Sequence, residues 1–149
     1  MLKTIAIVLG LLLALVIAFG LYRTLTPPAH LYVKAGSLAG CPARPSCVSS
    51  AAPEGGEHYI APPPAGVTLE ALAQAIVDAG GRIDDRQPDY LHAVFSTPRM
   101  RFRDDVEVLR TPQGLQWRSV SRFGYRDFGV NRARLEALRE QLAARQAGG

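Results

Sequence analysis

The feature that most constrains this chain is an apolar run near its N-terminus. The nineteen residues from Thr4 to Tyr22 carry no charge, with Lys3 before them and Arg23 after them. A bilayer-spanning helix needs about 20 apolar residues, whereas the apolar core of a secretory signal has about 7 to 15 and ends at a small-residue cleavage site. Residues 1–23 are therefore predicted to form an uncleaved transmembrane anchor, with a cleaved signal as the alternative.

The next stretch, residues 24–66, is rich in proline. It holds eight of the eleven prolines of the chain, together with the pair Gly55-Gly56. Proline fixes φ and removes an amide donor, so such a stretch favours an extended, polyproline-like backbone. The sequence predicts an arm that holds the folded part off the membrane, with His58-Tyr59-Ile60 docked on the domain as a short edge segment.

The two cysteines, Cys41 and Cys47, lie within this arm. Five intervening residues can close a small loop, and disulfides persist in oxidising compartments, so the pair predicts a disulfide in an exported protein. Two free thiols in a reducing compartment are the alternative. Leu38-Ala39-Gly40-Cys41 also resembles a bacterial lipidation box, but it follows the apolar run at too great a distance.

Location and metal binding follow from the same residues. The positive charges flanking the apolar run are nearly balanced, so the cysteine pair decides the orientation. The prediction is a single-pass protein of the inner (cytoplasmic) membrane, with its C-terminal domain in the periplasm or another extracytoplasmic space. The three histidines lack metal-site spacing, so neither a metal nor a cofactor is expected.

Residues 67–149 can form only one small domain. Thr68 is a suitable N-cap for a helix with an apolar stripe, listed as Leu69, Leu72, Ala73, Ile76 and Val77, and Gly80-Gly81 ends it. Strands are predicted over 82–85, 90–97 and 100–109, followed by a turn at 111–114, a strand ending at Phe123 and a helix from Asn131 to about Arg145. This order indicates an α+β fold: an antiparallel sheet meander with two helices packed on one face.

The stretch from Leu115 to Arg134 is the most distinctive part of the domain. Period-two geometry places Arg118, Val120 and Arg122 on one face of its strand, and Trp117, Ser119, Ser121 and Phe123 on the other. Gly124 and Gly129 then bracket a loop, and Asn131 is the predicted N-cap of the last helix. This stretch is therefore the candidate site of the domain.

Three ordered motifs resemble the domain-of-unknown-function family numbered 1499. They are Cys41-Pro42-x-x-Pro45-Ser46-Cys47-Val48-Ser49-Ser50, Arg101-Phe102-x-Asp104-Asp105-Val106-Glu107, and Arg118-Ser119-x-Ser121-Arg122-x-Gly124-Tyr125-x-Asp127-x-Gly129-Val130-Asn131-Arg132. The resemblance covers roughly Cys41 to Leu142 and departs from the family pattern at Ser46, where Asn is frequent. It implies an exported or membrane-associated protein of the kind found in bacteria and plastids, without a defined activity.

Two interpretations of the motif residues remain open. Arginine guanidinium groups suit carboxylate or phosphate, which predicts an anion site. Alternatively, the neighbouring acids neutralise the same arginines in an internal network, because a buried unpaired charge is costly. The candidate residues for either role are Arg101, Asp104, Asp105, Arg118, Ser119, Ser121, Arg122, Gly124, Tyr125, Asp127, Gly129, Asn131 and Arg132.

An enzyme is the second class considered. Ser119 or Ser121 could serve as a hydrolase nucleophile, with His92 as the base and Asp104 or Asp105 orienting it. Neither serine lies in a Gly-x-Ser-x-Gly elbow, and adjacent acids in a strand point to opposite faces. The aromatic residues of the stretch, Trp117, Phe123, Tyr125 and Phe128, are expected in the core, and the arginines of the last helix on a solvated face.

The sequence therefore predicts an envelope protein that is a non-enzymatic binding or structural module, with a small hydrolase as the alternative. Its predicted partners are the membrane, through residues 4–22, and an anionic lipid, a phosphate-bearing ligand or an envelope protein. The basic half, residues 99–145, has eleven arginines against six acids, which suits such ligands. Nucleic acid is excluded as a partner, because the anchor places the domain outside a nucleic-acid compartment.

Overall fold

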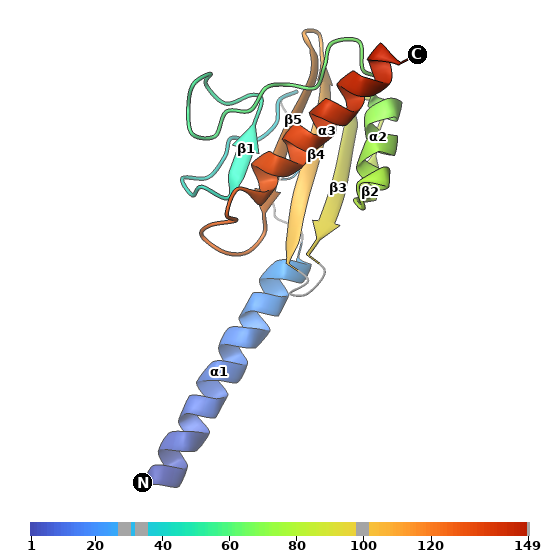
Figure 1. Ribbon diagram of the computed structural model, residues 1–149. Coiled ribbons are helices and arrows are strands. Elements are labelled where there is room, and N and C mark those ends of the chain that lie inside the picture. Colours follow the sequence, from blue (N-terminus) through green and yellow to red (C-terminus); the bar gives the residue numbers. More distant parts are fainter. Residues whose placement is uncertain (27–30, 32–35, 98–101, 149) are drawn as a thin grey trace.

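A computed structural model describes residues 1–26, 31, 36–97 and 102–148. Its elements are, in order, α1 (Leu2–Leu25), β1 (Cys47–Ser49), α2 (Leu69–Asp78), β2 (Arg82–Arg86), β3 (Tyr90–Ser96), β4 (Arg103–Thr111), β5 (Gly114–Ser121) and α3 (Val130–Ala147). Helix α1 projects away from the domain, and α2 and α3 lie together on one face of the sheet (Figure 1).

The sheet has five antiparallel strands in the order β1-β5-β4-β3-β2. Strands β2 to β5 follow one another as a meander, and β4 and β5 are joined by a turn in which Thr111 pairs with Gly114. The predicted α+β class is confirmed, since an N-terminal apolar helix precedes an antiparallel sheet with two further helices. The predicted strand positions are right to within a few residues.

The structure places part of the proline-rich arm inside the domain. Strand β1 pairs with β5, its Val48 belongs to the hydrophobic core, and Ile60 packs in the same core. The predicted docking of residues 58–60 is present, because Tyr59 forms an isolated bridge with Ser49. The arm predicted over 24–66 thus supplies an edge strand; a strand of only three residues is too short to give a recognisable alternation.

The helices begin and end for local reasons. The Thr68 side chain accepts a hydrogen bond from the Ala71 amide and caps α2 as predicted. After α2, a Cβ added to Gly81 would lie 2.7 Å from Phe95 and from Ile76, so only glycine allows this close approach. The predicted stripe of α2 is buried except at Val77, which is exposed.

Helix α3 starts one residue earlier than predicted, and its cap differs. Gly129, with φ of 80°, is the N-cap, whereas Asn131 lies inside the first turn. The Asp127 carboxylate accepts hydrogen bonds from the amides of Gly129 and Asn131 and so satisfies the free donors of this helix end. Asn131 is therefore not the N-cap; its side chain is used elsewhere.

The main core lies between the two helices and the sheet. Leu135, Leu138 and Leu142 of α3 form the predicted apolar stripe, and Trp117 of β5 is fully buried beneath it. The Trp117 indole N–H donates to the Ala61 carbonyl at 2.8 Å, which fastens the returning arm over the core.

The opposite face of the sheet, called the polar face below, is also buried but carries charged residues. A small apolar cluster of Leu38, Tyr90 and Leu109 closes one part of it. Leu38 belongs to the segment that leads into the disulfide between Cys41 and Cys47. The sequence-predicted disulfide is thus present, and it holds this segment against the sheet next to β1.

Candidate functional site

The polar face carries two rows of paired charges that cross β5, β4 and β3. In the first row, Arg118 and Glu107 face each other in the strand register, with Nε 3.0 Å from Oε2, and both side chains are buried. The Tyr90 hydroxyl donates to the second Glu107 oxygen at 2.9 Å. Burial, and then the Glu107 charge, raises the pKa of the Tyr90 phenol far above its usual range.

The second row is centred on Asp105. The guanidinium of Arg122 approaches this carboxylate through two nitrogens, with Nη2 2.7 Å from Oδ1 and Nε 2.9 Å from Oδ2. His92 Nε2 lies 2.8 Å from Oδ1 on the other side. Burial by itself would raise the pKa of Asp105, but the hydrogen bonds from His92 and Arg122 outweigh it, so this pKa is lowered.

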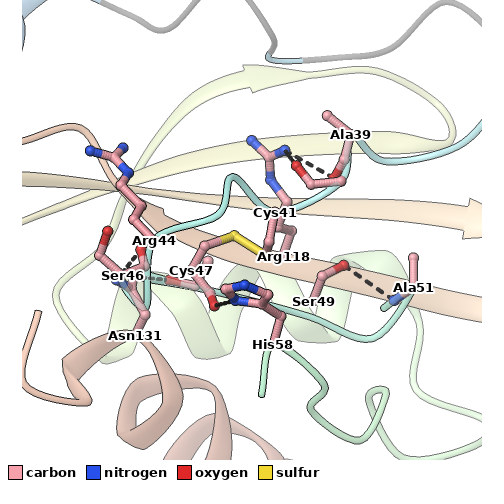
Figure 2. Close-up of a disulfide and its surroundings, with 12 residues drawn as sticks. Ala39, Cys41, Arg44, Ser46, Cys47, Ser49, Ala51, His58, Arg118 and Asn131 are labelled. Carbon is pink, nitrogen blue, oxygen red and sulfur yellow. Dashed lines mark hydrogen bonds between the residues drawn. A yellow bond between two sulfur atoms is a disulfide. The ribbon is translucent and has the colours of Figure 1, made fainter. Parts of the chain in front are cut away.

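Backbone carbonyls hold the outer ends of the two arginines. Arg118 Nη1 donates to the Ala39 and Gly40 carbonyls, as Figure 2 shows beside the disulfide. Arg122 Nη1 donates to the carbonyl of Leu25, the last residue of α1. Arg118 Nη2 has no hydrogen-bond partner among the described residues, but the residue is 0% exposed and closed to a ligand from solvent.

These contacts favour the internal network over an open anion site at the two strand arginines. The partners differ from those expected, because Asp127 pairs with neither Arg118 nor Arg122. They use Glu107 and Asp105, while Asp127 caps α3.

A second network lies on the helix face, around the fully buried Asn131. Its Nδ2 donates to Ser121 Oγ at 2.9 Å, to Asp127 Oδ2 at 2.7 Å and to the Ser46 carbonyl at 3.2 Å. Its Oδ1 accepts from Ser119 Oγ. Figure 2 shows the contact with Ser46, which lies next to the disulfide. Asn131 therefore joins α3, β5 and the segment before β1.

Asp104 points to this helix face and pairs with an arginine that the sequence placed in solvent. Arg134 Nη2 lies 2.6 Å from Asp104 Oδ2, and the guanidinium sits 4.6 Å from the centre of the Phe95 ring. The Arg134 side chain is largely buried as a result. The prediction that all arginines of α3 form a solvated face is wrong at this position, because Arg134 reaches an acid on the sheet.

The structure does not assemble the proposed hydrolase group. His92 and Asp105 lie on the polar face, whereas Ser119 and Ser121 lie on the helix face and bond to Asn131. The prediction that Asp104 and Asp105 point to opposite faces is correct, since the β4 to β5 register runs without a bulge.

The β5–α3 loop (residues 122–129) presents most of the predicted aromatic residues to solvent. Tyr125 is 67% exposed and Phe128 95%, so the expectation that they are core residues is wrong; Trp117 is the core member of the set. Phe123 stacks on Phe102 with ring centres 5.6 Å apart. Arg44 Nη1 donates a hydrogen bond to the Gly124 carbonyl, which holds the loop at this residue.

This loop borders a cavity of about 300 Å³, called the loop pocket below. Its lining consists of Thr97, Phe102, Asp104, Ser121, Phe123, Gly124, Arg126, Asp127, Phe128 and Val130. Of this lining, Asp104 is hydrogen-bonded to Arg134, and Asp127 and Ser121 are hydrogen-bonded to Asn131. Arg126 is exposed, and its side chain has no hydrogen bond or ion pair to any residue that the structure describes.

The loop pocket lies close to the C-terminal end of α1. A Cβ added to Gly20 would lie 3.7 Å from the Phe123 ring, and the Leu25 carbonyl bonds to Arg122. Two further arginines gather here. Burial, and then the charge of Arg23 in the last turn of α1, lowers the pKa of Arg44. Arg44 is engaged by the Ser121 and Gly124 carbonyls, whereas the Arg126 side chain has no such partner among the described residues.

The other predicted site residues are accounted for as follows. Arg101 lies outside the described residues. Arg132 is on the surface, where it donates to the Glu57 carbonyl and lies 3.9 Å from Glu136. Cys41 is held in the disulfide and offers no thiol. Among the described residues, no group of three acids, cysteines or histidines is placed to hold a metal ion.

Sequence reasoning missed Glu107, Arg134 and Arg126 as important residues. A signal for Glu107 did exist, because a two-residue turn at Pro112-Gln113 sets the β4 to β5 register and places Glu107 opposite Arg118. Arg126 could be singled out only once the partners of the other arginines were known.

Fold and site together define an α+β domain of buried ion pairs, joined to an N-terminal helix with the length and composition of a membrane span. A signal sequence has the same features, and the disulfide suggests an extracytoplasmic domain. The chain belongs to the family described as "Protein of unknown function (DUF1499)", whose model matches residues 37–142. No curated protein and no solved structure matches the chain.

Proposed function

We propose that this protein is a non-enzymatic module of the inner (cytoplasmic) membrane that binds an anionic lipid on the extracytoplasmic side. Helix α1 is the anchor, since an 18-residue window within Leu2–Arg23 has a mean hydropathy of 2.9. The disulfide supports the oxidising side of that membrane for the domain.

One observation carries the proposal: an exposed arginine, unpaired among the described residues, borders an apolar pocket beside the end of the anchor. Arg126 lines the loop pocket together with Phe102, Phe123 and Phe128. Ligand pockets are mostly apolar with a few polar groups that fix orientation. A lipid fits this chemistry, because Arg126 can pair with the phosphate while the aromatic side chains contact the upper part of an acyl chain.

The charge around the pocket favours an anion. Arg23 in the last turn of α1 and Arg44 on the other side of Gly124 are close enough for Arg23 to lower the pKa of Arg44. A lipid phosphate near Arg126 would be attracted by all three cations. The strand arginines Arg118 and Arg122 cannot compete with Arg126 for a lipid phosphate, because both are buried and paired with carboxylates.

The test is lipid binding by the full chain in detergent micelles, measured by native mass spectrometry. Anionic phosphatidylglycerol should remain bound in preference to zwitterionic phosphatidylcholine, and Arg126→Gln should abolish that preference. The matched control is Arg110→Gln, which removes an exposed arginine that pairs with Asp89 near the far end of β4. Equal retention of both lipids, or equal loss in both variants, would contradict the proposal.

A further inference from the structure

We infer that the β5–α3 loop inserts its aromatic tip into the interface of the same bilayer that α1 spans. The domain would then have two attachment points, the anchor and this loop. The inference concerns the bilayer surface as a whole and does not require a selected lipid in the loop pocket.

The exposed apolar surface outside α1 is concentrated at this loop. Of the large apolar side chains exposed after α1 in the part of the chain that the structure describes, only Val77 lies elsewhere. The others are Phe123, Tyr125, Phe128 and Val130. Phe123, Phe128 and Val130 line the same cavity, and exposed apolar side chains gathered in one place mark a site of contact with a partner or a membrane.

The backbone at the tip presents Phe128 outward under strain. Phe128 has φ of 55°, a left-handed conformation that is rare for a bulky residue, and Gly129 follows with φ of 80°. Asp127 holds this turn through its hydrogen bonds to the amides of Gly129 and Asn131. Glycine or asparagine would suit position 128 better in water, so a strained and fully exposed phenylalanine points to a use for its ring.

The position of α1 indicates that the Phe128 ring lies near the bilayer. Phe123 lies against Gly20, and the Leu25 carbonyl bonds to Arg122, so the loop begins alongside the last turns of the anchor. A helix rises 1.5 Å per residue, which places Gly20 about 4 to 5 Å deeper than Arg23, the first charge after the span. Figure 1 shows the loop between β5 and α3 on the side of the domain from which α1 projects.

The composition of the tip matches a bilayer interface. Tyrosine and other amphipathic aromatic rings favour the headgroup level, and arginine favours lipid phosphates. Tyr125 and Arg126 adjoin each other, with Phe128 two residues further along. A protein partner would have to reach this patch at the membrane boundary beside the anchor, whereas lipid is already present there.

The test uses tryptophan fluorescence of the full chain in phosphatidylcholine and phosphatidylglycerol vesicles. Native Trp117 is fully buried and serves as an unquenched internal reference. In Phe128→Trp, the new indole should lose most of its emission when the lipids are brominated near the headgroup end of the acyl chains. Val77→Trp places the indole at the matched exposed apolar position on α2. Its emission should be unaffected by brominated lipid and quenched by aqueous acrylamide.

Two results would overturn the inference. One is an indole at position 128 that acrylamide reaches as readily as at position 77 and that brominated lipid leaves unchanged. The other is protection from both quenchers, which would mean that a protein surface covers the loop. Tyr125→Trp repeats the measurement if Phe128→Trp alters the fold. Equal retention of phosphatidylglycerol and phosphatidylcholine by the native chain, with bromine quenching at position 128 still present, would remove the proposed function and leave this inference standing.

Discussion

Two groups of arginines in this domain have opposite surroundings. Arg118 and Arg122 on the polar face are buried, paired with carboxylates and capped by backbone carbonyls. Arg126, only four residues after Arg122, is exposed at an aromatic pocket and has no partner among the residues that the structure describes. The difference teaches that arginine richness covers two separate situations: the strand arginines pair with buried carboxylates inside the fold, and we propose that the loop arginine binds a ligand.

The buried pairs of the polar face also bear on how the strands are held together. A buried ion pair contributes little net stability, but leaving one partner alone is strongly unfavourable. The two rows connect β3, β4 and β5, and a shift of one residue in the register of a strand would move its charges to the other face of the sheet.

The largest expected effect comes from breaking the first row. Arg118→Ala leaves Glu107 buried without its cation and should lower the free energy of unfolding by about 3 to 5 kcal/mol. Urea unfolding followed by Trp117 emission measures this loss. Arg126→Ala is the matched control and should change stability by less than about 0.5 kcal/mol. Equal effects of the two substitutions would remove the distinction between the groups.

A second substitution tests the connection between sheet and loop. Asn131→Ala removes the amide that joins Ser121, Ser119 and the Ser46 carbonyl, and we expect a loss of about 1 to 3 kcal/mol because buried polar groups are left unsatisfied. Hydrogen exchange should also speed up across residues 122–131. Unchanged exchange there would show that Asn131 does not hold the loop.

A smaller effect is expected from pH. The pKa of Asp105 is lower in the folded chain than the value of about 3.9 in an unfolded chain, so its pairing stabilises the fold fully above about pH 4. This stability is lost as the pH falls through the folded pKa, at about 1.4 kcal/mol per unit of pKa difference. Urea midpoints measured from neutral to acidic pH should fall less steeply in Asp105→Asn. An identical slope in both proteins would show that Asp105 is not linked to stability.

Prediction from the sequence was most accurate where a short-range rule applies. Period-two alternation was enough to put Arg118 and Ser119 on opposite faces, and Thr68 marks the start of α2. It failed where distant segments meet, because the partner of Asp104 lies 30 residues away on α3, and β1 is recognisable only through its pairing with β5. The exposure of Phe128 was missed for a related reason: hydrophobicity predicts burial, and the turn that Asp127 stabilises points the ring outward.

The most direct test of the central claim compares Arg122→Gln with Arg126→Gln in thermal unfolding of the full chain, with and without phosphatidylglycerol. We predict that Arg122→Gln lowers the melting temperature but keeps the upward shift caused by the lipid, since its loss is structural. Arg126→Gln should keep the melting temperature and lose the shift, because a ligand stabilises only the state that binds it. A stable Arg122→Gln variant without the shift, beside an Arg126→Gln variant that retains it, would place the anion site on the sheet and contradict this account.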